Sequence, residues 1–522
     1  MPKLVKDNLF QLVKSLSKSE KRQFKLYVGR LEGNEDSKFL QLFNVLDKLT
    51  TYQEEHILSK TGISKRQLPN LKAHLYRQIL VSLRLSPSQQ NIRTQLREQL
   101  DFATILYRKG LYNQSLRLLD RAKSQALNYE EKHIASEIIE LEKVIESQYI
   151  TRSIKDRSEQ LITESELVTR QNILSSELSN LSLDLYGEFL KSGYAKNEEE
   201  YQKLRKFFDE RLPFYQSSEL GFREKLWLYK VYLWYSFLIQ DFRSCYRYAR
   251  KWVDLFEANE KMIELHPVFY LRGQQYLLES LFFIQDRARF TQALDRLEAR
   301  VNHPDFPKDD NVRSLSFLYV YSHKMNKHFL EGQFVNGLYL VPEVEAGILE
   351  FGEQLDEHHI MVFNYKIACM YFGAWDLKQC IAYLDRIISN KSLKMREDLL
   401  CFARILNLVA HYEAGMDYHL DSLIKSTYKF LIKMEDLYEV QKEMIKFLRG
   451  LGDIYPHQIK DAFRELHTKL KQYEDHPYER RSFLYLDILS WLESNIENRP
   501  IEQIIQEKIR LREENYSQEF GN

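Results

Sequence analysis

The stretch 101–122, DFATILYRKGLYNQSLRLLDRA, decides the fold. Small Ala103 lies seven residues before Gly110, and small Ser115 and Ala122 follow it. Small side chains let two antiparallel helices approach closely, and a glycine permits the turn between them. The stretch therefore predicts a helix hairpin.

The same arrangement of turn and small residue recurs along the chain. In most copies an aromatic or leucine side chain follows the turn, where it can pack between neighbouring hairpins. These positions are Tyr112, Phe242, Phe290, Phe334, Leu377 and Tyr418. From Phe242 onward they are 48, 44, 43 and 41 residues apart, and the 130 residues between Tyr112 and Phe242 equal three such steps. Cys245 and Cys380 occupy the small position of the second helix in their copies. The spacing indicates a series of similar hairpins.

This pattern resembles the helix hairpins of the tetratricopeptide superfamily, although its period exceeds the family's repeat of about 34 residues. The resemblance covers residues 99–430. It implies an all-α, right-handed α-solenoid of stacked antiparallel hairpins, whose concave groove holds peptides or helices of partner proteins. No clear copy occurs between residues 152 and 221, which form either one long helix or atypical repeats.

Composition supports an all-helical chain. Glycine and proline together number 28 of 522 residues, so turns are few and helices long. Residues 17 and 20, Ser and Glu, have the spacing of a capping box at a helix start. Near the end, Ile501, Ile504, Ile505 and Ile509 form one apolar stripe. We expect residues 431–522 to cap the solenoid.

The chain shows no secretory signal pattern, no long apolar segment and only four cysteines. We therefore expect a cytoplasmic protein that does not insert into membranes.

The first 98 residues form a predicted basic helical segment. Residues 1–100 carry 18 Lys and Arg against 9 Asp and Glu, and residues 57–97 contain no acid. The basic residues of that acid-free stretch are Lys60, Lys65, Arg66, Lys72, Arg77, Arg84, Arg93 and Arg97. They are the candidate contacts for an acidic protein partner or for nucleic acid. Alternatively, they lie on a solvated helix face or pair with acids of the same chain.

Residues 54–80 resemble a degenerate helix-turn-helix, with Gly62 at the turn and Ser64 at the start of a basic second helix. Pro69 argues against this, because proline belongs in the first turn of a helix and disrupts later ones. The favoured interpretation is a plain hairpin whose second helix begins near Pro69.

We find no catalytic, cofactor-binding or metal-binding motif. His358 and His359 are adjacent, so on a helix their rings point about 100° apart and do not readily share a metal.

The sequence therefore predicts a non-enzymatic protein-binding scaffold or adaptor, without a cofactor, that holds a partner segment in the solenoid groove. The alternative is a nucleic-acid-binding regulator that uses the basic N-terminal segment, with the repeats as a sensor. The partner and the oligomeric state remain open.

Overall fold

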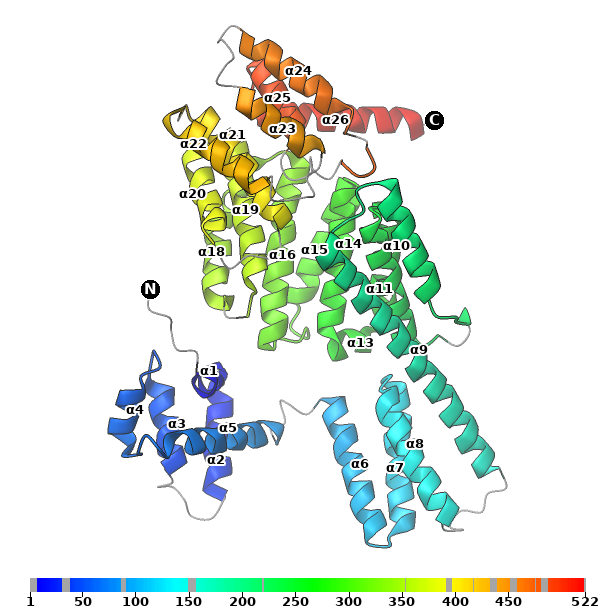
Figure 1. The fold of residues 1–522 in the computed structure, drawn as a ribbon. Coiled ribbons are helices and arrows are strands. Elements are labelled where there is room, and N and C mark those ends of the chain that lie inside the picture. Colours follow the sequence, from blue (N-terminus) through cyan, green and yellow to red (C-terminus); the bar gives the residue numbers. More distant parts are fainter. Residues whose placement is uncertain are drawn as a thin grey trace. The chain divides into compact units, whose positions relative to one another are not determined.

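The computed structural model describes residues 7–30, 38–85, 91–148, 156–217, 220–352, 354–390, 397–415, 417–431, 439–450, 458–474, 476–479 and 487–520. These residues form α-helices with no strand, as the composition predicts (Figure 1). The chain divides into two compact units, residues 1–168 and 169–522. The predicted boundaries at 98/99 and 430/431 stay predictions.

The first five helices share a core of their own. They are α1 (Asn8–Ser15), α2 (Lys18–Arg30), α3 (Lys38–Lys48), α4 (Glu54–Thr61) and α5 (Leu68–Arg84). Phe24 and Phe43 are fully buried at its centre, with ring centroids 4.7 Å apart. The predicted capping box is present, because the Ser17 backbone N–H donates to Glu20 over 2.8 Å and the Glu20 N–H donates to Ser17 Oγ over 3.2 Å.

A second core in this unit lies between α6 (Ile92–Arg108), α7 (Tyr112–Asn128), α8 (Lys132–Gln148) and the first turns of α9 (Arg157–Ser192). The hairpin α6–α7 has the turn and close contact that its sequence predicts. Ser115 Oγ donates to the Ala103 carbonyl over 2.8 Å, 12 residues upstream. Helix α9 is one continuous helix of 36 residues, and a second helix, α10 (Glu198–Arg211), follows it within the stretch 152–221, so the described part of that stretch is not a single helix.

Unit 2 contains the remaining helices and the largest core. Its helices are α10 (Glu198–Arg211), α11 (Phe222–Leu238), α12 (Phe242–Glu257), α13 (Glu260–Leu265), α14 (Pro267–Phe283), α15 (Arg287–Asn302), α16 (Asp310–Glu331), α17 (Phe334–Gly337), α18 (Leu340–Phe351), α19 (Glu357–Gly373), α20 (Leu377–Ile388), α21 (Glu397–Glu413), α22 (Asp417–Leu431), α23 (Glu439–Gly450), α24 (Ile459–Lys471), α25 (Ile488–Glu497) and α26 (Ile501–Phe520). Helices that follow one another pack together, as α11 does with α12 and α19 with α20. This packing is consistent with a helical repeat fold.

The hairpin turns of unit 2 share one backbone geometry. Gln240, Gln285 and Trp375 are each left-handed, with φ of 59°, 57° and 64°. The residue that follows each of them is an aspartate, and its backbone N–H donates to a carbonyl five residues upstream. That N–H closes the first helix in a Schellman-type cap. The aspartate side chain then accepts the N–H three residues downstream, at 3.0, 3.0 and 3.1 Å, and caps the second helix. One dipeptide thus ends one helix and begins the next.

The C-terminal helices pack back onto earlier parts of unit 2. Gln506 Nε2 in α26 donates to the Gly332 carbonyl over 3.0 Å, and Ile501 and Ile504 are buried. Tyr478 contacts the other end of this unit, because its hydroxyl donates to Glu198 over 3.2 Å and its carbonyl accepts from Gln240 Nε2 over 3.2 Å. Residues early and late in unit 2 are therefore in direct contact.

The aromatic run 227–252 forms the interior of the α11–α12 hairpin and its contact with α14. Tyr232 and Tyr248 stack with centroids 4.7 Å apart. Trp252 is fully buried and lies against Gly273, where an added Cβ would come within 2.8 Å of the indole Cδ1. The helices can approach this closely only because residue 273 has no side chain.

We expect Gly273→Ala to destabilise unit 2 by about 1–3 kcal/mol, because the new methyl group overlaps the Trp252 ring. The control is Gly187→Ala, a helical position where a Cβ meets nothing within 4 Å. The control should be neutral or should stabilise by up to about 1 kcal/mol, since alanine favours helix more than glycine. All five tryptophans lie in unit 2, so urea unfolding followed by tryptophan fluorescence measures this unit alone. Equal stabilities of the two variants would contradict the close packing.

Candidate binding surface

The eight candidate basic residues are distributed over three helices and one connection of the first unit. Lys60 lies at the end of α4, and Lys65 and Arg66 lie in the connection to α5. Lys72, Arg77 and Arg84 belong to α5, whereas Arg93 and Arg97 belong to α6.

Helix α5 begins at Leu68, with Pro69 in its first positions, as the proline predicts. Its N-cap is Gln67, so Ser64 does not cap it and Lys65 and Arg66 precede it. The connection after the left-handed Gly62 is therefore longer than a helix-turn-helix turn. Helices α4 and α5 each pack against α3, and the plain-hairpin interpretation stays a prediction.

Three of the eight basic residues pair with acids of the same chain. Lys72 binds the Asp7 carboxylate and donates to the Tyr52 hydroxyl over 2.9 Å, and these partners help to raise its pKa against the effect of burial. Arg93 Nε lies 3.0 Å from Glu131. Arg84 is 3.9 Å from Asp101 with both side chains about two-thirds exposed, a geometry that contributes little.

The other five are exposed and form no ion pair with any residue that the structure describes. They are Lys60, Lys65, Arg66, Arg77 and Arg97. The basic segment is thus only partly neutralised by its own chain.

Helix α5 has two apolar sides. Its inner side buries Leu68, Leu75 and Ile79 against the N-terminal core. Its outer side carries four apolar residues that are 36–55% exposed, and the two arginines of α5. The apolar residues are Tyr76, Leu80, Val81 and Leu85. The sequence analysis did not single these residues out. Apolar residues at 76, 80 and 81, away from the buried stripe at 68, 75 and 79, are the signal that would have identified them.

Exposed apolar side chains also continue beyond α5. Of 23 large apolar side chains that are exposed among the described residues, 15 fall between residues 76 and 190. Phe102 and Ile105 on α6 are each 50% exposed and lie one helical turn apart. Neighbouring exposed apolar side chains such as these two are typical of interaction surfaces.

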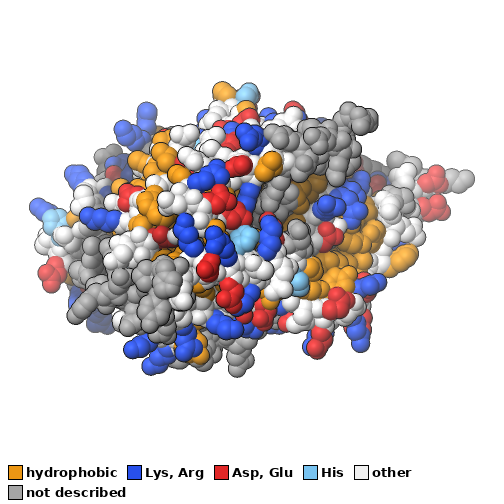
Figure 2. Space-filling view, turned by 90° about the horizontal axis from the view of Figure 1, so that it is seen from above, with side chains coloured by type: hydrophobic (Ala, Val, Ile, Leu, Met, Phe, Trp, Pro, Cys, Tyr) orange, Lys and Arg blue, Asp and Glu red, His pale blue; other side chains and the backbone are white. Residues whose placement is uncertain are grey.

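The face drawn in Figure 2 differs from the basic segment in charge. There, Lys and Arg side chains are interspersed with Asp and Glu. Residues 57–97 instead contain no acid.

The central helices of unit 2 are enclosed and carry buried polar groups. Eleven of the 17 residues of α19 are buried. The Lys366 ammonium in this helix donates to Ser322 Oγ over 2.6 Å and to the Ser322 carbonyl over 3.2 Å. Burial lowers the pKa of Lys366 to about 8. Burial, with a contribution from the Lys366 charge, also holds the pKa of His323 well below its usual range. A partner segment has no open path to these groups.

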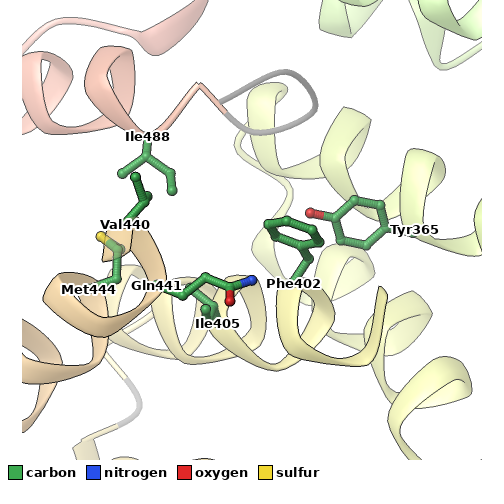
Figure 3. Close-up of a pocket in the computed structure, with 7 residues that line it drawn as sticks. All are labelled: Tyr365, Phe402, Ile405, Val440, Gln441, Met444 and Ile488. Carbon is green, nitrogen blue, oxygen red and sulfur yellow. The ribbon is translucent and has the colours of Figure 1, made fainter. Parts of the chain in front are cut away.

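A small cavity lies between α19, α21, α23 and α25 (Figure 3). Gln441 points into it among apolar side chains. The residues that line it are Tyr365, Phe402, Ile405, Val440, Gln441, Met444 and Ile488. It has room for about one water molecule, far less than a metabolite needs.

The four cysteines are free and buried. Burial raises the pKa of Cys369 to about 12 and that of Cys245 well above its usual range, so these thiols are protonated at neutral pH. Cys245 Sγ lies 3.9 Å from the Leu233 carbonyl, also 12 residues upstream, and so occupies the same place in its hairpin as Ser115 does in α6–α7. The packing role predicted for Cys245 agrees with this contact.

His359 pairs with the N-cap residue of its own helix, Asp356, over 2.7 Å. Within the described residues, no group of three His, Cys, Asp or Glu side chains could hold a metal ion. No helix in the described ranges combines the length and apolar character needed to cross a bilayer.

Comparison with known proteins gives no relative. No protein family, curated protein or solved structure matches the chain.

We expect the buried Lys366 ammonium to make the stability of unit 2 depend on pH. The folded pKa of about 8 lies below the ordinary value of 10.5. Between these values the unfolded chain binds more protons, so this residue makes stability rise with pH. The free energy of unfolding of the wild type should therefore increase, relative to that of Lys366→Met, by roughly 2–3 kcal/mol from pH 8 to pH 10.5.

Urea unfolding at a series of pH values, followed by tryptophan fluorescence, measures this difference. The control Lys378→Met removes an exposed lysine of α20 and should leave the pH dependence unchanged. A difference between wild type and Lys366→Met that stays constant with pH would contradict the burial of the charged amine.

Proposed function

We propose that this chain is a non-enzymatic protein-binding scaffold of the cytoplasm, and that its exposed apolar surface on α5 and α6 holds a segment of a partner protein. The observation that carries the proposal is the six large apolar side chains from Tyr76 to Ile105 that are exposed on or directly beside these two helices. Such surfaces are unfavourable in water unless a partner covers them.

The proposal includes a right-handed solenoid of tetratricopeptide-like hairpins. The shared turn geometry and the equivalent contacts of Ser115 and Cys245 support it. The enclosed helices of unit 2 favour a binding surface in the first unit over a groove around α19.

A nucleic-acid-binding regulator is the second candidate. Five exposed basic residues without a described acidic partner favour it. Binding of this kind weakens steeply with salt, because each neutralised phosphate releases counterions. Charge reversal of Lys65 and Arg66 should then abolish binding of a DNA or RNA duplex.

A tagged pull-down of the full chain from its native cells, with and without nuclease, separates the two candidates. A scaffold should retain a defined protein partner after nuclease treatment. The variant Phe102→Ser/Ile105→Ser should reduce recovery of that partner at least tenfold, because it removes two exposed apolar contacts of α6.

The matched control is Val335→Ser/Leu349→Ser, which alters two exposed apolar residues of unit 2. This variant should leave recovery unchanged. Loss of all partners on nuclease treatment would favour the regulator, and equal recovery with both variants would place the surface elsewhere.

A further inference from the structure

The outer face of α5 exposes apolar side chains and arginines together. Tyr76 and Leu80 lie one turn apart, and Arg77 and Arg84 lie two turns apart, about 10.5 Å along the axis. Val81 lies on the other side of the two arginines, about 140° around the helix from Tyr76. The inner face of the helix is already occupied, so these residues cannot turn inward without breaking the N-terminal core.

The composition of this face matches the centre of a protein interface. Tyrosine and arginine are the residue types that most often dominate binding energy, and leucine and valine add apolar area around them. Arg77 has no described acidic partner, and Arg84 has only the distant Asp101. Both guanidinium groups are therefore available to bind carboxylates in a forked geometry.

The positive charge around α5 favours a partner that carries negative charge. No acid occurs from residue 57 to residue 97, and Lys65 and Arg66 add positive charge before the N-terminus of α5. A partner that brings carboxylates gains from this charge, whereas a basic or neutral partner does not.

We propose that the outer face of α5 binds an acidic amphipathic helix of a partner protein. The partner's apolar stripe covers Tyr76 and Leu80, and carboxylates beside that stripe pair with Arg77 and Arg84. This inference rests on the proposed scaffold function and names the chemistry of one partner segment.

The exposed apolar residues favour a protein helix over nucleic acid at this face. Phosphates would satisfy the arginines, but they would leave Leu80, Val81 and Leu85 against charged and hydrated groups. A helix with alternating apolar and acidic faces satisfies both kinds of side chain together.

The test uses the full chain and a fluorescein-labelled 14-residue peptide that carries leucines on one helical face and glutamates on the others. Binding is measured by fluorescence anisotropy. The comparison probes are a scrambled peptide of the same composition and a 20-base-pair DNA duplex. We expect the amphipathic peptide to bind at least tenfold more tightly than the scrambled one.

Two variants of α5 test the two contributions separately. Arg77→Glu/Arg84→Glu and Tyr76→Ser/Leu80→Ser should each weaken peptide binding at least tenfold. All four side chains are exposed, so the fold should persist, and circular dichroism checks this. The matched control Arg243→Glu/Arg247→Glu makes the same charge change on exposed residues of α12 and should alter affinity less than twofold.

The scrambled peptide keeps the charge of the amphipathic peptide but loses its apolar face. If both peptides bound equally well, charge alone would explain binding and the proposal would be overturned. Peptide binding that neither α5 variant alters would also overturn it, as would tighter binding of the duplex with the same dependence on Arg77 and Arg84. If the peptide fails while a cellular partner still depends on Phe102 and Ile105, the scaffold function stands and only the α5 surface is wrong.

Discussion

The turn between the two helices of a hairpin is the constraint on which unit 2 depends. At Gln240, Gln285 and Trp375 the backbone adopts a left-handed conformation that ordinary side chains disfavour. The following aspartate compensates by capping the next helix, while its own N–H satisfies the end of the previous one. Because both helix ends are fixed by two adjacent residues, the helices must run antiparallel and close together. The small residues and glycines at their contacts follow from that distance.

Because α19 is packed closely by other helices, buried polar groups on and beside it lose contact with water. Once α19 is enclosed, Lys366 and His323 can no longer reach water, so their pKa values fall and their hydrogen bonds must come from neighbouring helices. Ser322 supplies them for Lys366, and Gln275 supplies one for His323 at 2.7 Å. These contacts connect α14, α16 and α19 in a specific register. The same enclosure removes these helices from the set of surfaces that a partner could reach.

The features that were predictable from the sequence are those set by nearby residues. The hairpin turn at Gly110, the start of α5 at Pro69 and the capping box at Ser17 each depend on a few neighbours, and the structure has all three. The contact of Tyr478 with Glu198 joins residues 280 positions apart, and no local pattern encodes it. The pairing of Lys72 with Asp7 was equally hidden, since only the packed core brings α5 to the start of α1. For the candidate site, the basic residues were visible as a run without acids. Which of these basic residues pair with a described acid, and which do not, depends on tertiary structure.

The two units differ in how densely exposed apolar side chains occur along the chain. Of the 23 large apolar side chains that are exposed among the described residues, 12 lie in unit 1, which has 168 residues, and 11 lie in unit 2, which has 354. Unit 1 thus exposes apolar side chains at about twice the density of unit 2, although its helices have buried cores of their own. Packing in the N-terminal core accounts for the apolar residues on the inner face of α5 but not for those on its outer face. Exposed apolar side chains beside Arg77 and Arg84 are stable in water only at a cost in hydration, and the acidic helix proposed for this face would offset that cost while leaving the internal packing of the helices unchanged.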